Sequence, residues 1–94
     1  MNESTRCVRA RVTGRVQGVG YRMATRCRAH QLGLRGRVSN CLNGEVEVLA
    51  YGPAEAVMTL VEWLAEGPPA ARVENVHVEE LDEVLEEPGR FEIR

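Results

Sequence analysis

The stretch CVRARVTGRVQGVGYRMATRCRAHQLGL, residues 7–34, decides the fold of this chain. Its first part alternates apolar with polar side chains, which predicts a β-strand over residues 6–13 with one apolar face. Its last part, from Arg22 onward, lacks proline and places Gly33 where a helix would end. The stretch therefore predicts a strand that leads into a helix through a loop rich in glycine.

The rest of the chain predicts a hairpin, a second helix and two further strands. Asn43-Gly44 favours a tight turn between two strands within residues 36–52. Apolar residues then recur with helical spacing until the sequence GPP, residues 67–69, ends the pattern. We expect a fourth strand at residues 71–81, an acidic connection at 81–89 and a short final strand at 90–94.

The order β-α-β-β-α-β with a short C-terminal strand is typical of the ferredoxin-like α+β sandwich, with a mainly antiparallel sheet and two helices on one face. The other face would meet water, because it carries charged residues: Arg9, Arg11, Arg37, Glu45 and Glu47. We expect a single domain over residues 1–94, with residues 1–5 as a flexible N-terminus. Many unrelated activities share this fold, so the fold alone does not identify a function.

Composition narrows the classes of partner. A net charge of -2 over 94 residues gives no general attraction to nucleic acid. No apolar run reaches the roughly 20 residues that a membrane-spanning helix needs. The N-terminal sequence MNESTR has no apolar core that could serve as a secretory signal. We therefore expect a cytoplasmic protein with neither nucleic acid nor membrane as its partner.

Cysteine and lysine usage excludes some chemistry. Cys7, Cys27 and Cys41 show neither a Cys-x-x-Cys motif nor a Cys/His ligand spacing. We expect buried or inert thiols rather than a zinc site or a disulfide framework. All twelve basic residues are arginines, so a catalytic lysine is excluded.

Gly14, Gly18 and Gly20 lie in the predicted strand–helix loop. The backbone N–H groups of such a loop can converge on an anion, and the positive end of the helix dipole reinforces the site. Arg22 at the helix start costs about 0.3–1 kcal/mol unless an anion lies between it and the helix. The loop is therefore either a plain turn or a phosphate site. The glycine spacing fits neither the Rossmann nor the P-loop pattern, so nucleotide binding is not supported.

Asn40 is the second candidate site residue. It shares strand parity with Val38 and is predicted to point toward the helix-covered face, where a polar group needs a partner. It could also be a hairpin residue bonded to local backbone. We expect structural roles for the remaining candidates, with His30 and His77 in solvent and Trp63 and Tyr51 packed at the edge of the core.

Two segments, VTGRVQGVGYR (residues 12–22) and GRVSNCLNGEVEVLAYG (residues 36–52), resemble the two signatures of the acylphosphatase family. The similarity extends over nearly the entire predicted domain. It implies a ferredoxin-like enzyme that hydrolyses the carboxyl–phosphate bond of a small-molecule acyl phosphate to a carboxylate and inorganic phosphate. It also implies that no metal and no cofactor takes part. We expect the protein to be a monomer.

The resemblance also implies roles for particular residues. Arg22 matches the catalytic arginine that binds the substrate phosphate, and Asn40 matches the catalytic asparagine that orients the attacking water. The phosphate-binding loop corresponds to Arg15, Val16, Gln17, Gly18, Val19 and Gly20. The chain departs from the family pattern at Tyr21, Arg37 and Ser39.

Two alternative functions are a non-catalytic binding module and an RNA-binding protein. A non-catalytic ferredoxin-like module would bind a phosphorylated ligand or protein at the loop without turnover. An RNA-binding variant of the fold is disfavoured, because the predicted open sheet face lacks exposed aromatic residues and the chain is acidic.

Overall fold

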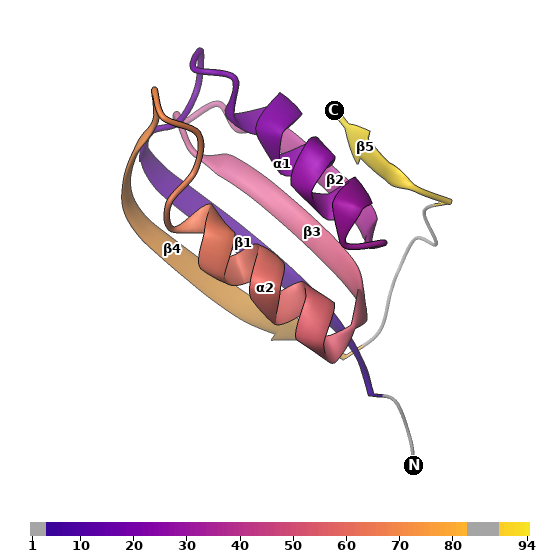
Figure 1. Cartoon of the computed structure of the whole chain (residues 1–94). Coiled ribbons are helices and arrows are strands. Elements are labelled where there is room, and N and C mark those ends of the chain that lie inside the picture. Colours follow the sequence, from indigo (N-terminus) through magenta and orange to yellow (C-terminus); the bar gives the residue numbers. More distant parts are fainter. Residues whose placement is uncertain (1–3, 83–88) are drawn as a thin grey trace.

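The computed structural model describes residues 4–82 and 89–94 (Figure 1). Most of the expected acidic connection at 81–89 lies outside the described residues. Residues 1–3 of the N-terminal segment that we expect to be flexible lie outside them as well. The first strand already begins at Thr5, within that segment.

The described residues form five strands and two helices in the predicted order. The strands are β1 (Thr5–Arg15), β2 (Arg35–Asn40), β3 (Val46–Pro53), β4 (Arg72–Leu81) and β5 (Phe91–Ile93), and the helices are α1 (Tyr21–Gln31) and α2 (Ala54–Leu64). The sheet has the order β4-β1-β3-β2-β5, and every pair is antiparallel except β2–β5. Both helices cover one face of the sheet (Figure 1). The ferredoxin-like prediction is therefore confirmed.

The hydrophobic core lies between the helices and the sheet. Along β1, Val8, Ala10 and Val12 are at most 1% exposed, and β3 buries small apolar residues directly opposite them. Ala29 of α1 and Leu60 of α2 belong to the same cluster. Strand alternation puts Val8, Ala10 and Val12 on this face and Arg9 and Arg11 on the other.

β1 is longer than predicted, since it runs to Arg15 rather than ending near residue 13. Its last residues pair with β4, and the register shifts between Thr13 and Gly14. Thr13 pairs with Asn75 and Gly14 pairs with Val73, so Glu74 of β4 is the extra residue of a bulge, and such a residue bends the strand that carries it. The bulge depends on the pairing of two strands that are far apart in the chain, so the local sequence pattern does not reveal it.

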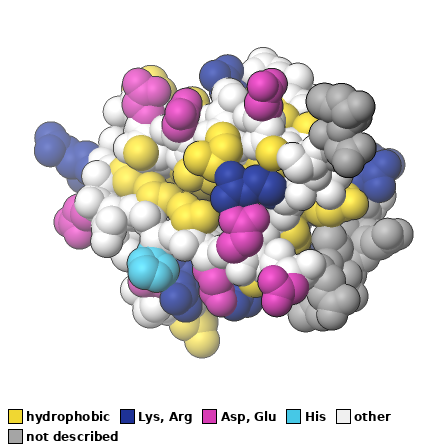
Figure 2. Space-filling model, turned by 90° about the horizontal axis from the view of Figure 1, so that it is seen from below, with side chains coloured by type: hydrophobic (Ala, Val, Ile, Leu, Met, Phe, Trp, Pro, Cys, Tyr) yellow, Lys and Arg dark blue, Asp and Glu magenta, His cyan; other side chains and the backbone are white. Residues whose placement is uncertain are grey.

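The sheet face opposite the helices carries paired charges. Arg9 on β1 donates to Glu79 on β4 at 3.0 Å, and it lies 4.0 Å from Glu47 on β3. At the end of the molecule seen in Figure 2, acidic and basic side chains are interspersed around a hydrophobic band. Neither sign of charge dominates that view. None of the helices in the described chain is long and apolar enough to cross a membrane.

The histidines and aromatic residues occupy structural positions. His77 is exposed, as predicted. His30 is exposed too, but its Nε2 atom lies 3.2 Å from the main-chain oxygen of Phe91, so its ring also contacts β5. Trp63 packs against the core, as predicted, with its ring centroid 5.9 Å from that of Tyr21.

The three thiols are free. Cys7 is buried, Cys41 is half-buried and Cys27 is exposed. Burial raises the pKa of the Cys7 and Cys41 thiols, and nearby glutamates raise the pKa of both further. A raised pKa keeps a thiol protonated and unreactive at neutral pH. The prediction of buried or inert thiols therefore suits Cys7 and Cys41, whereas Cys27 is exposed and does not fit the buried part of it.

Candidate active site

The loop between β1 and α1 forms one side of a pocket of about 280 Å³. The residues that line it come from the loop, from the start of α1, from β2 and from β5. They are Val16, Gly18, Gly20, Tyr21, Arg22, Met23, Asn40 and Ile93. The fold therefore brings Arg22 and Asn40 together with three residues of the predicted phosphate loop.

The loop backbone leads into α1 without a side chain that caps the first N–H groups of the helix. Gly18 and Gly20 have φ angles of +76° and +79°, which lie in the left-handed region that favours glycine. Gly20 is the N-cap residue of α1, and no side chain caps the helix there. No acidic residue lies in the first turn either. The first N–H groups of α1 therefore lack a side-chain acceptor and can bind an anion from the pocket.

Arg22 is half-buried in the first turn of α1. Its Nη1 atom donates to the main-chain oxygen of Arg94 at 3.0 Å. One contact with the end of the chain thus restrains the guanidinium beside the pocket. A guanidinium has five N–H donors, so the others can bind an anion there.

Asn40 is the last residue of β2, and its side chain is exposed at the pocket. It shares the pocket with the start of α1, in agreement with the strand parity that places it on the helix side. Because the Asn40 side chain is exposed, water can satisfy its amide and no protein hydrogen-bond partner is required. That amide can donate to or accept from a water molecule in the pocket.

The other predicted loop residues do not line the pocket. Arg15 is exposed at the end of β1, and Val19 packs against the hydrophobic core. Gln17 donates from Nε2 to the main-chain oxygens of Cys41 and Glu45, so its side chain is bound to the β2–β3 turn. These residues can contribute backbone N–H groups to an anion site, but their side chains are engaged elsewhere or directed to solvent.

Three further residues line the pocket that sequence reasoning did not assign to the site. Tyr21 and Met23 flank Arg22 in the sequence, and that adjacency is a signal that could have been used. Ile93 reaches the pocket only because β5 pairs with β2, which no local pattern reveals. Met23 is 53% exposed, so the pocket has an accessible apolar wall beside Arg22.

Tyr21 departs from the family pattern, and the structure supplies a partner for its additional hydroxyl. The side chain is 1% exposed, and its hydroxyl donates to the main-chain oxygen of Leu64 at 2.7 Å. Burial raises the pKa of the Tyr21 phenol, so the group stays neutral. Tyr21 therefore joins α1 to the end of α2, and its phenol is too weak an acid to protonate a substrate at neutral pH.

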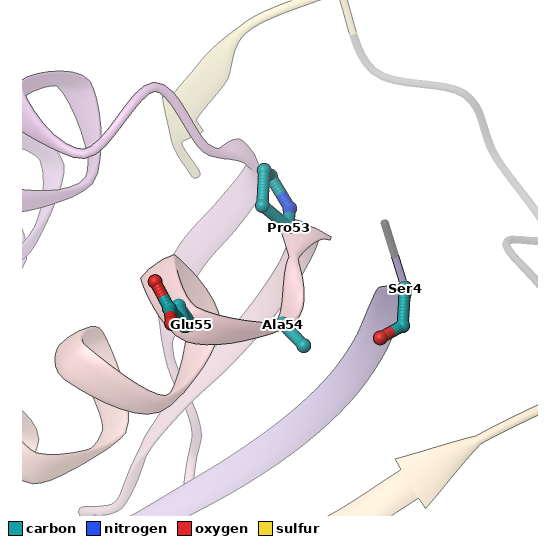
Figure 3. A pocket seen from close by; sticks show the side chains of 4 residues that line it. All are labelled: Ser4, Pro53, Ala54 and Glu55. Carbon is teal, nitrogen blue, oxygen red and sulfur yellow. The ribbon is translucent and has the colours of Figure 1, made fainter. Parts of the chain in front are cut away.

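A second pocket of about 280 Å³ lies near the N-terminus, between the start of β1 and the start of α2 (Figure 3). Ser4, Pro53, Ala54 and Glu55 line it. The described residues that line it offer a carboxylate and a hydroxyl but no cation, a set that does not suit a phosphate group. Within residues 4–82 and 89–94, no group of three or more His, Cys, Asp or Glu residues could hold a metal ion.

Comparison with known proteins identifies close relatives. The family model described as Acylphosphatase matches residues 8–93. A curated acylphosphatase from Halorhodospira halophila is 50% identical over 91 residues, which cover 97% of this chain and 94% of that protein.

Two solved structures are also similar to the chain. An acylphosphatase from Coxiella burnetii has a TM-score of 0.88 and 43% identity, and the match covers 96% of this chain and 93% of that one. An acylphosphatase from Bacillus subtilis has a TM-score of 0.89 and 39% identity, and the match covers 95% of this chain and 98% of that one.

Proposed function

Because the chain belongs to the acylphosphatase family, it hydrolyses the carboxyl–phosphate bond of acyl phosphates, and we propose that Arg22 and Asn40 carry out this reaction. The observation that carries the proposal is the shared pocket. Arg22, Asn40 and the open helix start lie around one space although they belong to different elements.

In this proposal the phosphoryl group binds between the loop and Arg22. The N–H groups of loop residues 15–20 and of the first turn of α1 donate to its oxygens. Arg22 adds a second set of donors and a positive charge. Positioning and electrostatic stabilisation of this kind account for most of phosphoryl-transfer catalysis. The anion would also stabilise Arg22 at the positive end of the helix dipole.

Asn40 then orients a water molecule for in-line attack on phosphorus. The bond from phosphorus to the acyl oxygen breaks, and the carboxylate leaves without a general acid because it is a weak base. No Asp, Glu or His is among the described residues that line the pocket. We therefore assign the water proton to a phosphoryl oxygen of the substrate.

We further propose that residues 1–94 act as one domain, and that the enzyme is a cytoplasmic monomer that needs neither metal nor cofactor. Free thiols suit a reducing compartment. Within residues 4–82 and 89–94, the large hydrophobic side chains that are exposed belong to separate elements; they are Met23, Leu42, Met58 and Val78. The interspersed charges give no basic patch for nucleic acid in the view of Figure 2.

Steady-state hydrolysis of benzoyl phosphate in the presence of EDTA tests the site. Arg22→Ala should lower both kcat and the affinity for inorganic phosphate, because it removes the phosphate ligand. Asn40→Ala should lower kcat with little change in phosphate affinity, because it removes only the group that orients water. Each loss should be at least about 100-fold in kcat, the scale of a lost positioning or charge-stabilising group.

Matched variants keep this test interpretable. Arg28→Ala on the same helix and Asn75→Ala on β4 remove the same side-chain types away from the pocket, and they should retain wild-type kinetics. Arg22→Lys should fail nearly as badly as Arg22→Ala, because an ammonium lacks the planar fork of donors. Wild-type turnover by either alanine variant of the pocket would refute the assignment.

A further inference from the structure

Gln17 connects the two parts of the pocket through its side chain. Its Nε2 atom lies 2.8 Å from the main-chain oxygen of Cys41 and 2.9 Å from that of Glu45. The amide nitrogen of glutamine carries two hydrogen atoms, so each carbonyl accepts one N–H. We infer that Gln17 is a positioning residue that fixes Asn40 relative to the phosphate-binding loop.

The two carbonyls lie at the neck of the β2–β3 hairpin, next to Asn40. The N–H of Cys41 donates to the main-chain oxygen of Glu45 at 2.8 Å, which closes the hairpin at this point. Asn40 is the last residue of β2 and directly precedes Cys41. Gln17 therefore holds the hairpin beside the residue that orients water.

Loss of this contact should change the geometry of the pocket more than the fold. The oxygen of Cys41 also accepts the N–H of Gly44 at 3.2 Å, and the oxygen of Glu45 accepts that of Cys41. Each carbonyl thus keeps a partner when Gln17 is replaced, and no buried acceptor is left unpaired. The loop and the hairpin would each keep their own structure, and Val12 would still pair with Val46, but the contact that holds the loop at Gln17 against the hairpin would be lost.

Catalysis depends on that separation, and in this respect the inference rests on the proposed function. The loop and Arg22 hold the phosphoryl group, whereas Asn40 aims the water at phosphorus. A shift of the hairpin moves the water away from the line of attack without disturbing the phosphate. A misplacement of about 1 Å can lower a rate by about 100-fold.

Gln17→Met is the test variant, because methionine keeps the length of the side chain and removes both N–H donors. Gln31→Met is the matched control, since Gln31 is the other glutamine of the chain and lies at the end of α1. We expect Gln17→Met to lower kcat for benzoyl phosphate by about 10- to 100-fold. The inhibition constant of inorganic phosphate should stay unchanged, and Gln31→Met should match the wild type. An unchanged kcat, or a parallel loss of phosphate affinity, would overturn the inference.

A double variant distinguishes an effect of Gln17 through Asn40 from an effect on the rest of the active site. If Gln17 acts only through Asn40, Gln17→Met should have no further effect on the residual rate of Asn40→Ala. A full additional loss in the double variant would contradict the positioning role. If Gln17→Met does not fold by circular dichroism, Gln17→Asn takes its place, because the shorter amide cannot reach both carbonyls.

Titration with inorganic phosphate, followed by NMR, decides the same question without turnover. In the wild-type protein, phosphate should shift both the loop amides and the side-chain amide of Asn40. In Gln17→Met the loop amides should respond and the Asn40 amide should not. A wild-type Asn40 response in this variant would overturn the inference. Normal phosphate responses in a wild-type protein that does not hydrolyse benzoyl phosphate would instead refute the proposed reaction alone.

Discussion

Arg22 stands at the helix end where a cation is least favourable. A cation at this position costs about 0.3–1 kcal/mol of stability when no anion is bound. Among the described residues, the main-chain oxygen of Arg94 accepts a hydrogen bond from the Arg22 guanidinium. The sequence could predict the importance of Arg22 because the misplaced charge is local. It could not predict Arg94 as the restraint, since that contact depends on how β5 pairs with β2.

Tyr21 supplies a prediction about pH. Burial raises the pKa of its phenol above the ordinary 10.0, so the fold favours the neutral form. The contribution of Tyr21 to the free energy of unfolding should be constant below about pH 10 and should fall as the pH rises further, because the phenol then ionises first in the unfolded chain. Urea denaturation should show this alkaline loss in the wild type and in Tyr51→Phe.

Tyr21→Phe should lose about 1 kcal/mol of stability at neutral pH, because it removes the hydrogen bond to Leu64. It should also lack the part of the alkaline loss that Tyr21 causes. An alkaline loss of full size in Tyr21→Phe would mean that another group is responsible.

At the scale of elements, the loop, the start of α1 and the β2–β3 hairpin form the candidate site. Alternation and glycine placement predict the strands and the helix starts, because those signals are local. The bulge of β4 opposite Thr13 and Gly14 and the contact from Gln17 to the hairpin are not local, so the sequence pattern cannot reveal them. The resemblance to the family identifies Gln17 as a loop residue but not the partners of its side chain.

The loop glycines carry a prediction with a matched control. Gly18 and Gly33 have φ angles of +76° and +71°, and an added Cβ at either position would meet no other heavy atom within 4 Å. An alanine at either position should therefore lower the free energy of unfolding by about 1–2 kcal/mol through backbone strain. Only Gly18 lines the pocket, so Gly18→Ala should weaken inhibition by inorganic phosphate and Gly33→Ala should not. Equal phosphate affinities in the two variants would contradict the phosphate-loop assignment.

At the scale of the whole molecule, the sheet order brings the two halves of the site together. β2 lies between β3 and β5, so Asn40 at its end reaches the side of the sheet where α1 begins. The order of elements in the sequence predicts this topology, because few arrangements of β-α-β-β-α-β bury both helices on one sheet. The added parallel strand β5 could be predicted as a strand but not as part of the pocket.

Ligand binding should stabilise this whole arrangement. At a phosphate concentration of 100 times its dissociation constant, the free energy of unfolding should rise by about 2.7 kcal/mol. Thermal unfolding should show the increase in the wild type and in Arg28→Ala. Arg22→Ala should show a much smaller increase at the same phosphate concentration. A full increase in Arg22→Ala would place the phosphate somewhere else on the protein.

Hydrolysis of benzoyl phosphate in water enriched with ¹⁸O, with EDTA present, tests the central claim most directly. If the loop and Arg22 hold the phosphoryl group while Asn40 aims water at phosphorus, mass spectrometry should find the label in inorganic phosphate and none in benzoate. Label in benzoate would show that water attacks the carbonyl carbon instead, and that result would contradict the account.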